Sequence, residues 1–349
     1  MLGSMNPLVD YLNSLRTQDG ASNPNYVEEN RADYVERLRA DHRWFPTEAQ
    51  LRVKTRISAL VAAMRRSDFP IDLVILTGDA GDGKTAFLQK LERAAQDEQA
   101  IIDHSLQNGA RFELRGRTFL SNYDGSQDEG DQKNDDVLRA FLAPFKGSDS
   151  SGWATSKETR LIAINEGRLV DFLEANRADF PALATLVKEG LRTGEPAEGV
   201  AVVNLNLRSV VVDPQGFDNS ILERLVNRMT HERFWKPCHG CDLKNKCYAF
   251  HNAQSIQDET AGKHVVERLK SLYGITHLRG RLHITLRDLR SSLAYMLVGT
   301  RDCDEIHELY KSGQRNEIIQ GFYFNSWQGG DAPDRKSTRL NSSHANVSR

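Results

Sequence analysis

The chain has 349 residues, of which 39% are hydrophobic, so it is long enough for about two domains with cores of their own. Its 46 basic and 48 acidic residues nearly cancel, which excludes a global electrostatic attraction to nucleic acid or to an anionic membrane. Three of the four cysteines crowd between Cys238 and Cys247, which is the spacing of metal ligands rather than of a disulfide framework. Because no apolar run is long enough to cross a bilayer, we expect a cytoplasmic protein without a membrane partner.

Helical spacing of apolar residues marks the beginning of the chain. It extends from residue 7 to about residue 42, and residues 1–46 are predicted to form a helical lead-in. A second amphipathic stretch over residues 47–66 starts directly after Pro46. It leads to the apolar run DLVILT at residues 72–77, which is typical of a strand buried on both faces of a parallel sheet.

A glycine-rich loop follows this strand, and a helix follows the loop. The loop fits the pattern G-x-x-x-x-G-K-[ST] and consists of Gly78, Asp79, Ala80, Gly81, Asp82, Gly83, Lys84 and Thr85. Glycines allow successive backbone N–H groups to point at a phosphate, and the start of the helix adds a partial positive charge. In this pattern Lys84 contacts the β- and γ-phosphates, while the Thr85 hydroxyl binds Mg²⁺. The sequence therefore predicts a P-loop that binds ATP or GTP.

Strands and helices continue to alternate as far as about residue 216. The predicted elements are, in order, a β-ribbon over residues 112–114 and 118–122, a strand over 161–164, a helix over 167–189 and a strand over 199–207. The polar segment over residues 123–135 is predicted to be exposed. This alternation predicts an α/β fold for residues 47–216, as a P-loop NTPase three-layer sandwich with a parallel sheet.

Polar residues stand at the ends of the last two predicted strands. One strand leads to Asn165 and Glu166, and the other carries Asn204 and Asn206. With the P-loop, this pattern resembles the AAA+ and related ATPases, in which a second strand ends in an Asp–Glu pair. The resemblance implies Glu166 as the general base and Asn165 in the place of the magnesium-binding Asp. It also implies Asn206, or else Asn204, as the residue that contacts the γ-phosphate.

These roles have simpler alternatives. Asn165 brings no charge to a metal, so hydrolysis is expected to be slow, and the Asn165–Glu166 pair could instead cap the next helix. Asn204 and Asn206 could be ordinary turn residues.

From about residue 218 the pattern becomes helical, and residues 217–333 are predicted to be a helical lid region. Within it, Arg287 is followed by an acidic residue and a leucine. This resembles the AAA+ lid helix whose arginine reaches back to the nucleotide, which implies that Arg287 senses the γ-phosphate. A solvated arginine on an amphipathic helix is the alternative. Residues 334–349 include DRKSTRLNSSH, which resembles a translated sequencing adapter, and are set aside as an artefactual or disordered tail.

Three of the four cysteines are close together in the lid region. A C-x-x-C turn followed by a third Cys and a His predicts a small structural zinc knuckle with the ligands Cys238, Cys241, Cys247 and His251. His239 or the distant Cys303 could replace the last of these. An iron–sulfur cluster that recruits Cys303 is the other metal centre that the residues allow.

Basic and aromatic residues are interleaved around the cysteines, over residues 228–250. Such a mixture can contact phosphates and stack on bases, but it can equally form a small core or dock a protein.

Taken together, the motifs predict an ATPase that uses Mg²⁺-dependent ATP hydrolysis to drive conformational change in a larger assembly. We expect ATP, Mg²⁺ and structural zinc as cofactors, with nucleic acid, other proteins and further copies of the chain as partners. By analogy, the assembly would belong to bacterial defence or DNA processing. The alternatives are a nucleotide-dependent switch or scaffold without hydrolysis, and a P-loop small-molecule kinase, which the long polar segment 123–135 disfavours.

Overall fold

The computed structural model describes most of two regions of the chain. The described residues are 6–17, 64, 71–153, 157–207, 211, 220–278 and 284–325. Most of the predicted lead-in, the helix over residues 47–66 apart from the helical Met64, the boundary near residue 216 and the tail lie outside them.

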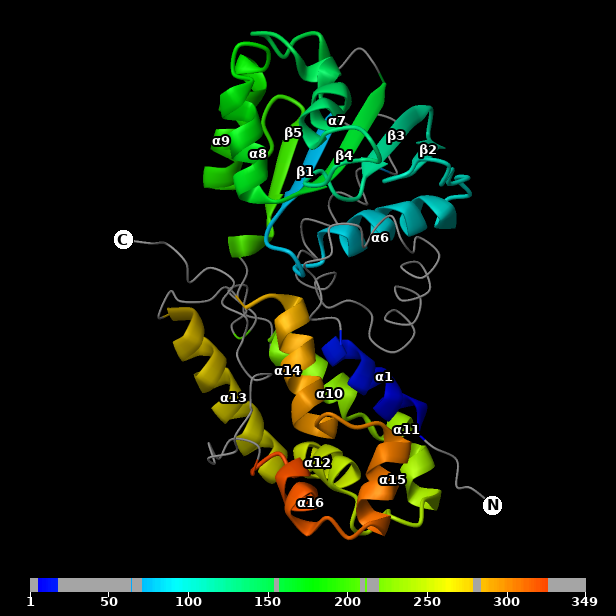
Figure 1. The fold of residues 1–349 in the computed structure, drawn as a ribbon. Coiled ribbons are helices and arrows are strands. Elements are labelled where there is room, and N and C mark those ends of the chain that lie inside the picture. Colours follow the sequence, from blue (N-terminus) through cyan, green and yellow to red (C-terminus); the bar gives the residue numbers. More distant parts are fainter. Residues whose placement is uncertain are drawn as a thin grey trace.

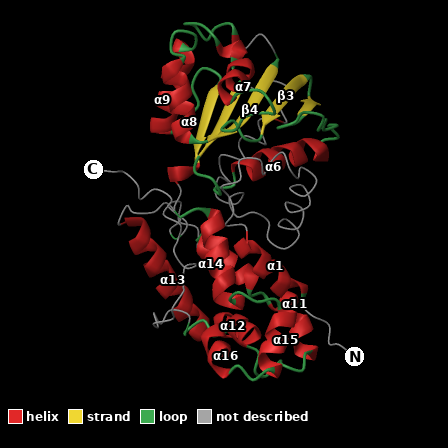
Figure 2. Ribbon diagram, in the orientation of Figure 1, coloured by secondary structure: helices red, strands yellow, loops and turns green. Residues whose placement is uncertain are grey.

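A five-stranded sheet forms the centre of the first region (Figures 1 and 2). Its strands are β1 (Leu73–Thr77), β2 (Arg111–Leu114), β3 (Arg117–Asn122), β4 (Glu158–Ile164) and β5 (Val200–Asn204). In space their order is β2-β3-β4-β1-β5, and all neighbours are parallel except the antiparallel pair β2 and β3. The predicted parallel sheet and the predicted β-ribbon are both confirmed, and the ribbon lies at one edge of the sheet.

Helices cover both faces of this sheet (Figure 1). They are α6 (Lys84–Asp97) on one face, and α7 (Asn134–Phe141), α8 (Glu166–Ala175) and α9 (Pro181–Thr193) on the other. Because side chains alternate along a strand, Val74 and Leu76 of β1 pack with Phe87 of α6, whereas Leu73 and Ile75 pack in the core beneath α8 and α9. This helix–sheet–helix arrangement agrees with the predicted three-layer α/β sandwich.

The prediction of one helix over residues 167–189 is wrong, because two helices occupy this part of the chain. α8 ends at Ala175, and Pro181 begins α9. Proline lacks the N–H that a continuing helix needs, and its ring disfavours the helical conformation at the preceding residue. Phe180 accordingly has φ −124° and ψ 46°, which turns the chain between the two helices.

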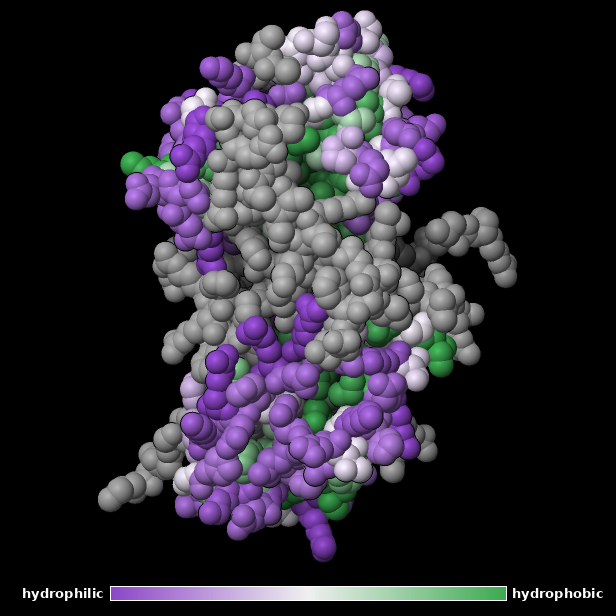
Figure 3. Space-filling view, turned by 180° about the vertical axis from the view of Figure 1, so that it is seen from behind, coloured by the Kyte–Doolittle hydropathy of each residue, from purple (hydrophilic) through white to green (hydrophobic). Residues whose placement is uncertain are grey.

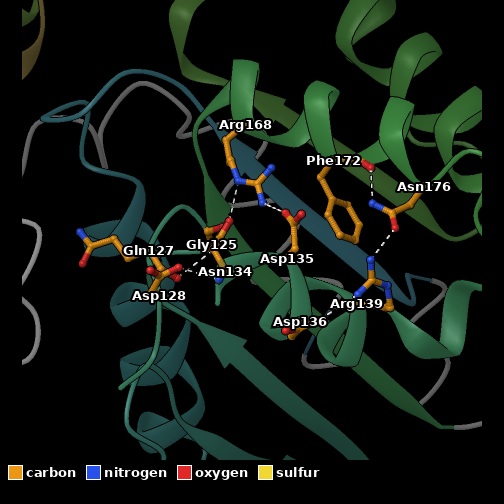
Figure 4. A network of polar contacts seen from close by, with 10 residues as sticks. All are labelled: Gly125, Gln127, Asp128, Asn134, Asp135, Asp136, Arg139, Arg168, Phe172 and Asn176. Carbon is orange, nitrogen blue, oxygen red and sulfur yellow. Dashed lines mark hydrogen bonds and ion pairs between the residues drawn. The ribbon is translucent and has the colours of Figure 1, made fainter. Parts of the chain in front are cut away.

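The polar segment over residues 123–135 is less exposed than predicted, because its first half folds onto the sheet. Gly125 is buried, and its carbonyl oxygen accepts a hydrogen bond of 2.9 Å from the Asn134 side-chain amide. The same amide donates to the Gln127 carbonyl at 2.8 Å, and Arg168 of α8 donates to Asn134 Oδ1 (Figure 4). This network fixes the segment beside the ends of β3 and β4.

The second region is helical and has its own core. Its longer helices are α1 (Pro7–Thr17), α10 (Ile221–Met229), α12 (Tyr248–Gln257), α13 (Ala261–Leu278), α14 (Leu286–Val298) and α15 (Cys303–Lys311). Shorter elements are α11 (Glu232–Trp235), the 3-10 helix η5 (Lys236–Gly240) and α16 (Arg315–Gly321). Leu8 and Leu12 of α1 belong to the same core as Leu289 and Leu293 of α14. The first helix of the chain is therefore part of the C-terminal helical region.

The helices of both regions are amphipathic rather than apolar throughout. None of the helices in the described residues is long and apolar enough to cross a bilayer. Hydrophilic side chains cover most of the described surface that is visible in Figure 3.

Candidate functional site

Three glycines shape the loop between β1 and α6. Gly78, Gly81 and Gly83 have φ values of 151°, 101° and 88°, which side-chain-bearing residues rarely adopt. Asp82 is fully buried, and its Oδ2 accepts a hydrogen bond of 2.9 Å from the Asp79 backbone N–H. Gly83 caps α6, so the loop runs into the positive end of that helix. The loop lies at the carboxyl end of β1, where open α/β sheets bind their ligands.

Lys84 is the first residue of α6, and its ammonium group lies inside the turn of the loop. Its Nζ donates to the carbonyl oxygens of Gly78 at 2.8 Å and Asp79 at 2.9 Å, and to Asn165 Oδ1 at 3.0 Å. Burial lowers the pKa of Lys84, while nearby carboxylates, Asp124 foremost, oppose that shift. The positive charge is therefore held by three neutral acceptors that an anion could replace.

Asp124 lies two residues after β3, and its charge acts on Lys84. Its carboxylate is half-buried and accepts hydrogen bonds from the Ser126 N–H at 3.0 Å and from Gln127 Nε2 at 2.8 Å. Burial raises the pKa of Asp124, although the Ser126 hydrogen bond and the Lys84 charge lower it. A hydrogen bond of 3.0 Å from Thr85 Oγ1 to the Tyr123 carbonyl brings the Thr85 hydroxyl to the same strand end.

The sequence reasoning missed Asp124. It lies in a polar segment that was predicted to be an exposed loop, and β3 is separated from β1 by β4 in the sheet. The available signal was an acidic residue two positions after the strand at residues 117–122.

Four further residues meet the loop from the ends of β4 and β5. Glu166 Oε2 accepts hydrogen bonds from Asn204 Nδ2 at 2.9 Å and Asn206 Nδ2 at 3.1 Å. Asn206 Oδ1 accepts a hydrogen bond of 3.0 Å from the Asp79 backbone N–H. With Asn165 bonded to Lys84, the structure brings together all four polar residues that the sequence singled out on these strands.

Arg287 reaches the same loop from the helical region. Its backbone N–H donates to the Gly81 carbonyl at 3.3 Å. A Cβ at Gly81 would lie 2.9 Å from Arg287 Cβ and 3.0 Å from Thr285 Oγ1, so the loop and the start of α14 touch without room for a side chain. Thr285 begins α14 through a capping box with Asp288, which fixes the position of the helix start.

The cysteines form a separate cluster in the helical region. Cys238, Cys241, Cys247 and Cys303 are all free thiols and line one cavity. His251 is exposed and lines a different pocket. The structure thus does not bring the predicted ligand His251 to the three neighbouring cysteines. It places Cys303 there instead, together with His307, whose Nε2 lies 3.3 Å from Cys241 Sγ.

The aromatic residues around the cysteines are mainly part of a core. Trp235, Tyr248 and Phe250 are buried, which leaves them no face for stacking on bases. Phe234 is half-buried, and the Arg233 guanidinium lies 4.3 Å from its ring centroid. Of the interpretations that the sequence left open, a small core fits these residues best.

Comparisons with known proteins provide no relative for the chain. Scans against protein-family models, curated proteins and solved structures each found no match. The functional argument therefore rests on the geometry of the loop and its neighbours.

Proposed function

We propose that the chain is an AAA+-like P-loop ATPase that binds ATP at residues 78–85 and hydrolyses it with Mg²⁺. The observation that carries this proposal is the position of Lys84, whose ammonium is held at the sheet edge by two carbonyls and one amide. Phosphate oxygens would replace these acceptors and add charge complementarity. The three glycines and the start of α6 supply the backbone N–H groups that a phosphate needs.

We assign magnesium to Thr85 and Asp124 rather than to Asn165. Mg²⁺ prefers hard oxygen ligands, and P-loop NTPases hold it with the loop hydroxyl and a strand-end Asp. Asp124 supplies the charge that Asn165 lacks, and the Thr85 hydroxyl bonds to the residue directly before it. Asn165 bonds to Lys84 instead, so we assign it the role of positioning that lysine.

Glu166 remains our proposed general base. The two asparagine amides of Asn204 and Asn206 hold its carboxylate at the edge of the loop. A carboxylate fixed in this way can orient a water and accept its proton. The contact of Arg287 with Gly81 supports a link from the γ-phosphate to the helical region, so hydrolysis would change how that region is held.

Phosphate release from ATP tests this function. We expect Mg²⁺-dependent release by the full chain, and its loss in Lys84→Ala. Lys188→Ala, which changes an exposed lysine on α9, is the matched control and should behave as the unaltered chain does. Failure of the unaltered chain to bind ATP would contradict the proposal. Stimulation of release by single- or double-stranded DNA would identify nucleic acid as a partner.

A nucleotide-dependent switch without turnover is the second candidate. Its supporting observation is that Glu166 Oε2 already accepts two amide hydrogen bonds, while Asn165 adds no charge. Glu166→Gln separates the two functions. An ATPase should keep ATP binding and lose phosphate release, whereas a switch should bind ATP tightly, release no phosphate and be unchanged by the substitution.

A further inference from the structure

Four cysteines from three separate elements surround one cavity. Cys238 lies in η5 and Cys241 directly after it, Cys247 is the N-cap of α12, and Cys303 is the first residue of α15. The cavity wall also includes apolar side chains, among them Trp235. Folding, rather than closeness in sequence, places Cys303 beside the other three.

N–H donors point at the sulfurs of the first two cysteines. Asn6 Nδ2 donates to Cys238 Sγ at 3.3 Å, and the Leu243 backbone N–H donates to Cys241 Sγ at 3.4 Å. Such hydrogen bonds stabilise a thiolate more than a neutral thiol, and they are a regular feature around metal-bound sulfur.

The other two cysteines lie at the N-termini of helices. Cys247 caps α12, a helix of 10 residues, and Cys303 begins α15, a helix of 9 residues. Helix N-termini favour the thiolate, which is the form of cysteine that binds metals. An N–H donor or a helix start therefore lies beside each of the four sulfurs, whereas burial raises the pKa of the Cys238, Cys247 and Cys303 thiols in the metal-free chain.

We propose that Cys238, Cys241, Cys247 and Cys303 hold a thiolate-bound metal centre, either a zinc ion or an iron–sulfur cluster. Four thiolates are a complete ligand set for both. The centre would connect η5, α12 and α15, and through Asn6 also the start of α1. This inference does not rest on the proposed ATPase function, because the cluster and the phosphate-loop site share no residue.

The two kinds of centre ask for different arrangements of the thiols. Among the described residues, no three Cys, His, Asp or Glu side chains converge closely enough to hold one ion. Sulfurs about 2.3 Å from one zinc would be about 3.8 Å from one another. In an iron–sulfur cluster the thiolates bind different iron atoms around a core, so cysteines that line a cavity need not converge on one point.

Metal analysis of the full chain, purified without oxygen, provides the first test. We expect bound metal in stoichiometric amount. Iron with acid-labile sulfide and broad visible absorption would identify the cluster, and about one zinc per colourless chain would identify the single ion. Either result supports the metal centre, and a metal-free chain overturns it.

Two variants then test the ligand set. Cys303→Ser should lower metal retention by at least about tenfold, whereas His251→Ala should keep the metal content of the unaltered chain. Full retention by a folded Cys303→Ser chain, or loss in His251→Ala, would overturn the proposed ligands. If Cys303→Ser does not fold, alkylation of the unaltered chain decides. The proposal is supported if all four cysteines are protected from alkylation and a chelator abolishes that protection. It is overturned if Cys303 reacts freely in the metal-loaded chain.

Discussion

The Asp124 carboxylate places a negative charge near the Lys84 ammonium of the phosphate loop. If it holds Mg²⁺ with Thr85, Asp124→Asn should keep the shape of the site but raise the Mg²⁺ concentration required for ATP turnover by at least about tenfold. Turnover measured against Mg²⁺ concentration checks this. Asp131→Asn, in the exposed half of the same segment, is the control and should leave the requirement unchanged. An unchanged requirement in Asp124→Asn would return the metal role to Asn165.

The raised pKa of Asp124 makes the site sensitive to acid. Below that pKa the carboxyl is protonated and no longer attracts Mg²⁺. As the pH is lowered, Mg²⁺-dependent turnover should therefore begin to fall at a higher pH than it would if the ligand were an exposed Asp. A pH–rate profile should show this acid limb for the unaltered chain and not in the residual activity of Asp124→Asn. An identical acid limb in both would show that another group titrates.

The same shift has a consequence for stability. Because the folded chain binds this proton more tightly than the unfolded chain, the contribution of Asp124 to stability is fully present below its ordinary pKa. That contribution is lost as the pH rises through the raised pKa. At neutral pH the charged residue is therefore retained at some expense of stability, as is common at functional sites.

At the scale of elements, one asparagine connects three helices of the helical region. Asn252 of α12 has no exposed surface, and its Nδ2 donates to the carbonyl oxygens of Met296 at 3.2 Å, Leu297 at 3.0 Å and Gly321 at 2.9 Å. Its Oδ1 accepts a hydrogen bond of 3.1 Å from the Tyr323 N–H. The side chain thus satisfies backbone groups at the ends of α14 and α16 that have no partner within their own helices.

Asn252→Leu keeps the branching of the side chain, with a larger volume, and removes these hydrogen bonds. Because the carbonyls stay buried, the free energy of unfolding should fall by about 2–4 kcal/mol. Urea unfolding followed by circular dichroism measures the change. Gln254→Leu on the exposed side of the same helix is the control, with an expected effect within about 0.5 kcal/mol. Equal unfolding midpoints for the two variants would show that the buried amide contributes little.

Local patterns in the sequence predicted most of the elements. The apolar run at residues 72–77 became β1, and the ribbon around Arg115 and Gly116 formed because both residues adopt positive φ values, 54° and 76°. Pro181 was also a local signal, because a proline disfavours a helix through the preceding residue, and the prediction of one helix over residues 167–189 did not use it.

The spatial order of the strands and the packing of distant helices could not be predicted from local sequence patterns. The spatial order that puts β4 between β3 and β1 depends on pairing between distant segments. The acidic residue after the strand at residues 117–122 could therefore not by itself reveal that Asp124 lies near Lys84. Cys303 is a similar case. C-x-x-C spacing identifies ligands on one turn, but a ligand on a later helix is recognised only after the helices have packed.

At the scale of the molecule, the sheet region and the helical region meet at the phosphate loop. Gly81 lies against the start of α14 so closely that a Cβ would be 2.9 Å from Arg287 Cβ. The residues that would hold the nucleotide are therefore also residues of the contact between the regions. A nucleotide bound at the loop can favour one arrangement of the two regions only if it makes contacts in that arrangement that it lacks in others. Arg287 is the residue of the helical region positioned to make such contacts.

Arg287→Ala should therefore separate nucleotide binding from its effect on the helical region. We expect ATP with Mg²⁺ to slow amide hydrogen exchange at the start of α14 in the unaltered chain. In Arg287→Ala this protection should disappear while ATP still binds, with an affinity about tenfold lower because one charge-assisted contact is lost. Arg268→Ala, at an exposed position on α13, should keep both the affinity and the protection. Equal protection in Arg287→Ala and Arg268→Ala would mean that the loop backbone, and not the guanidinium, carries the coupling between the regions.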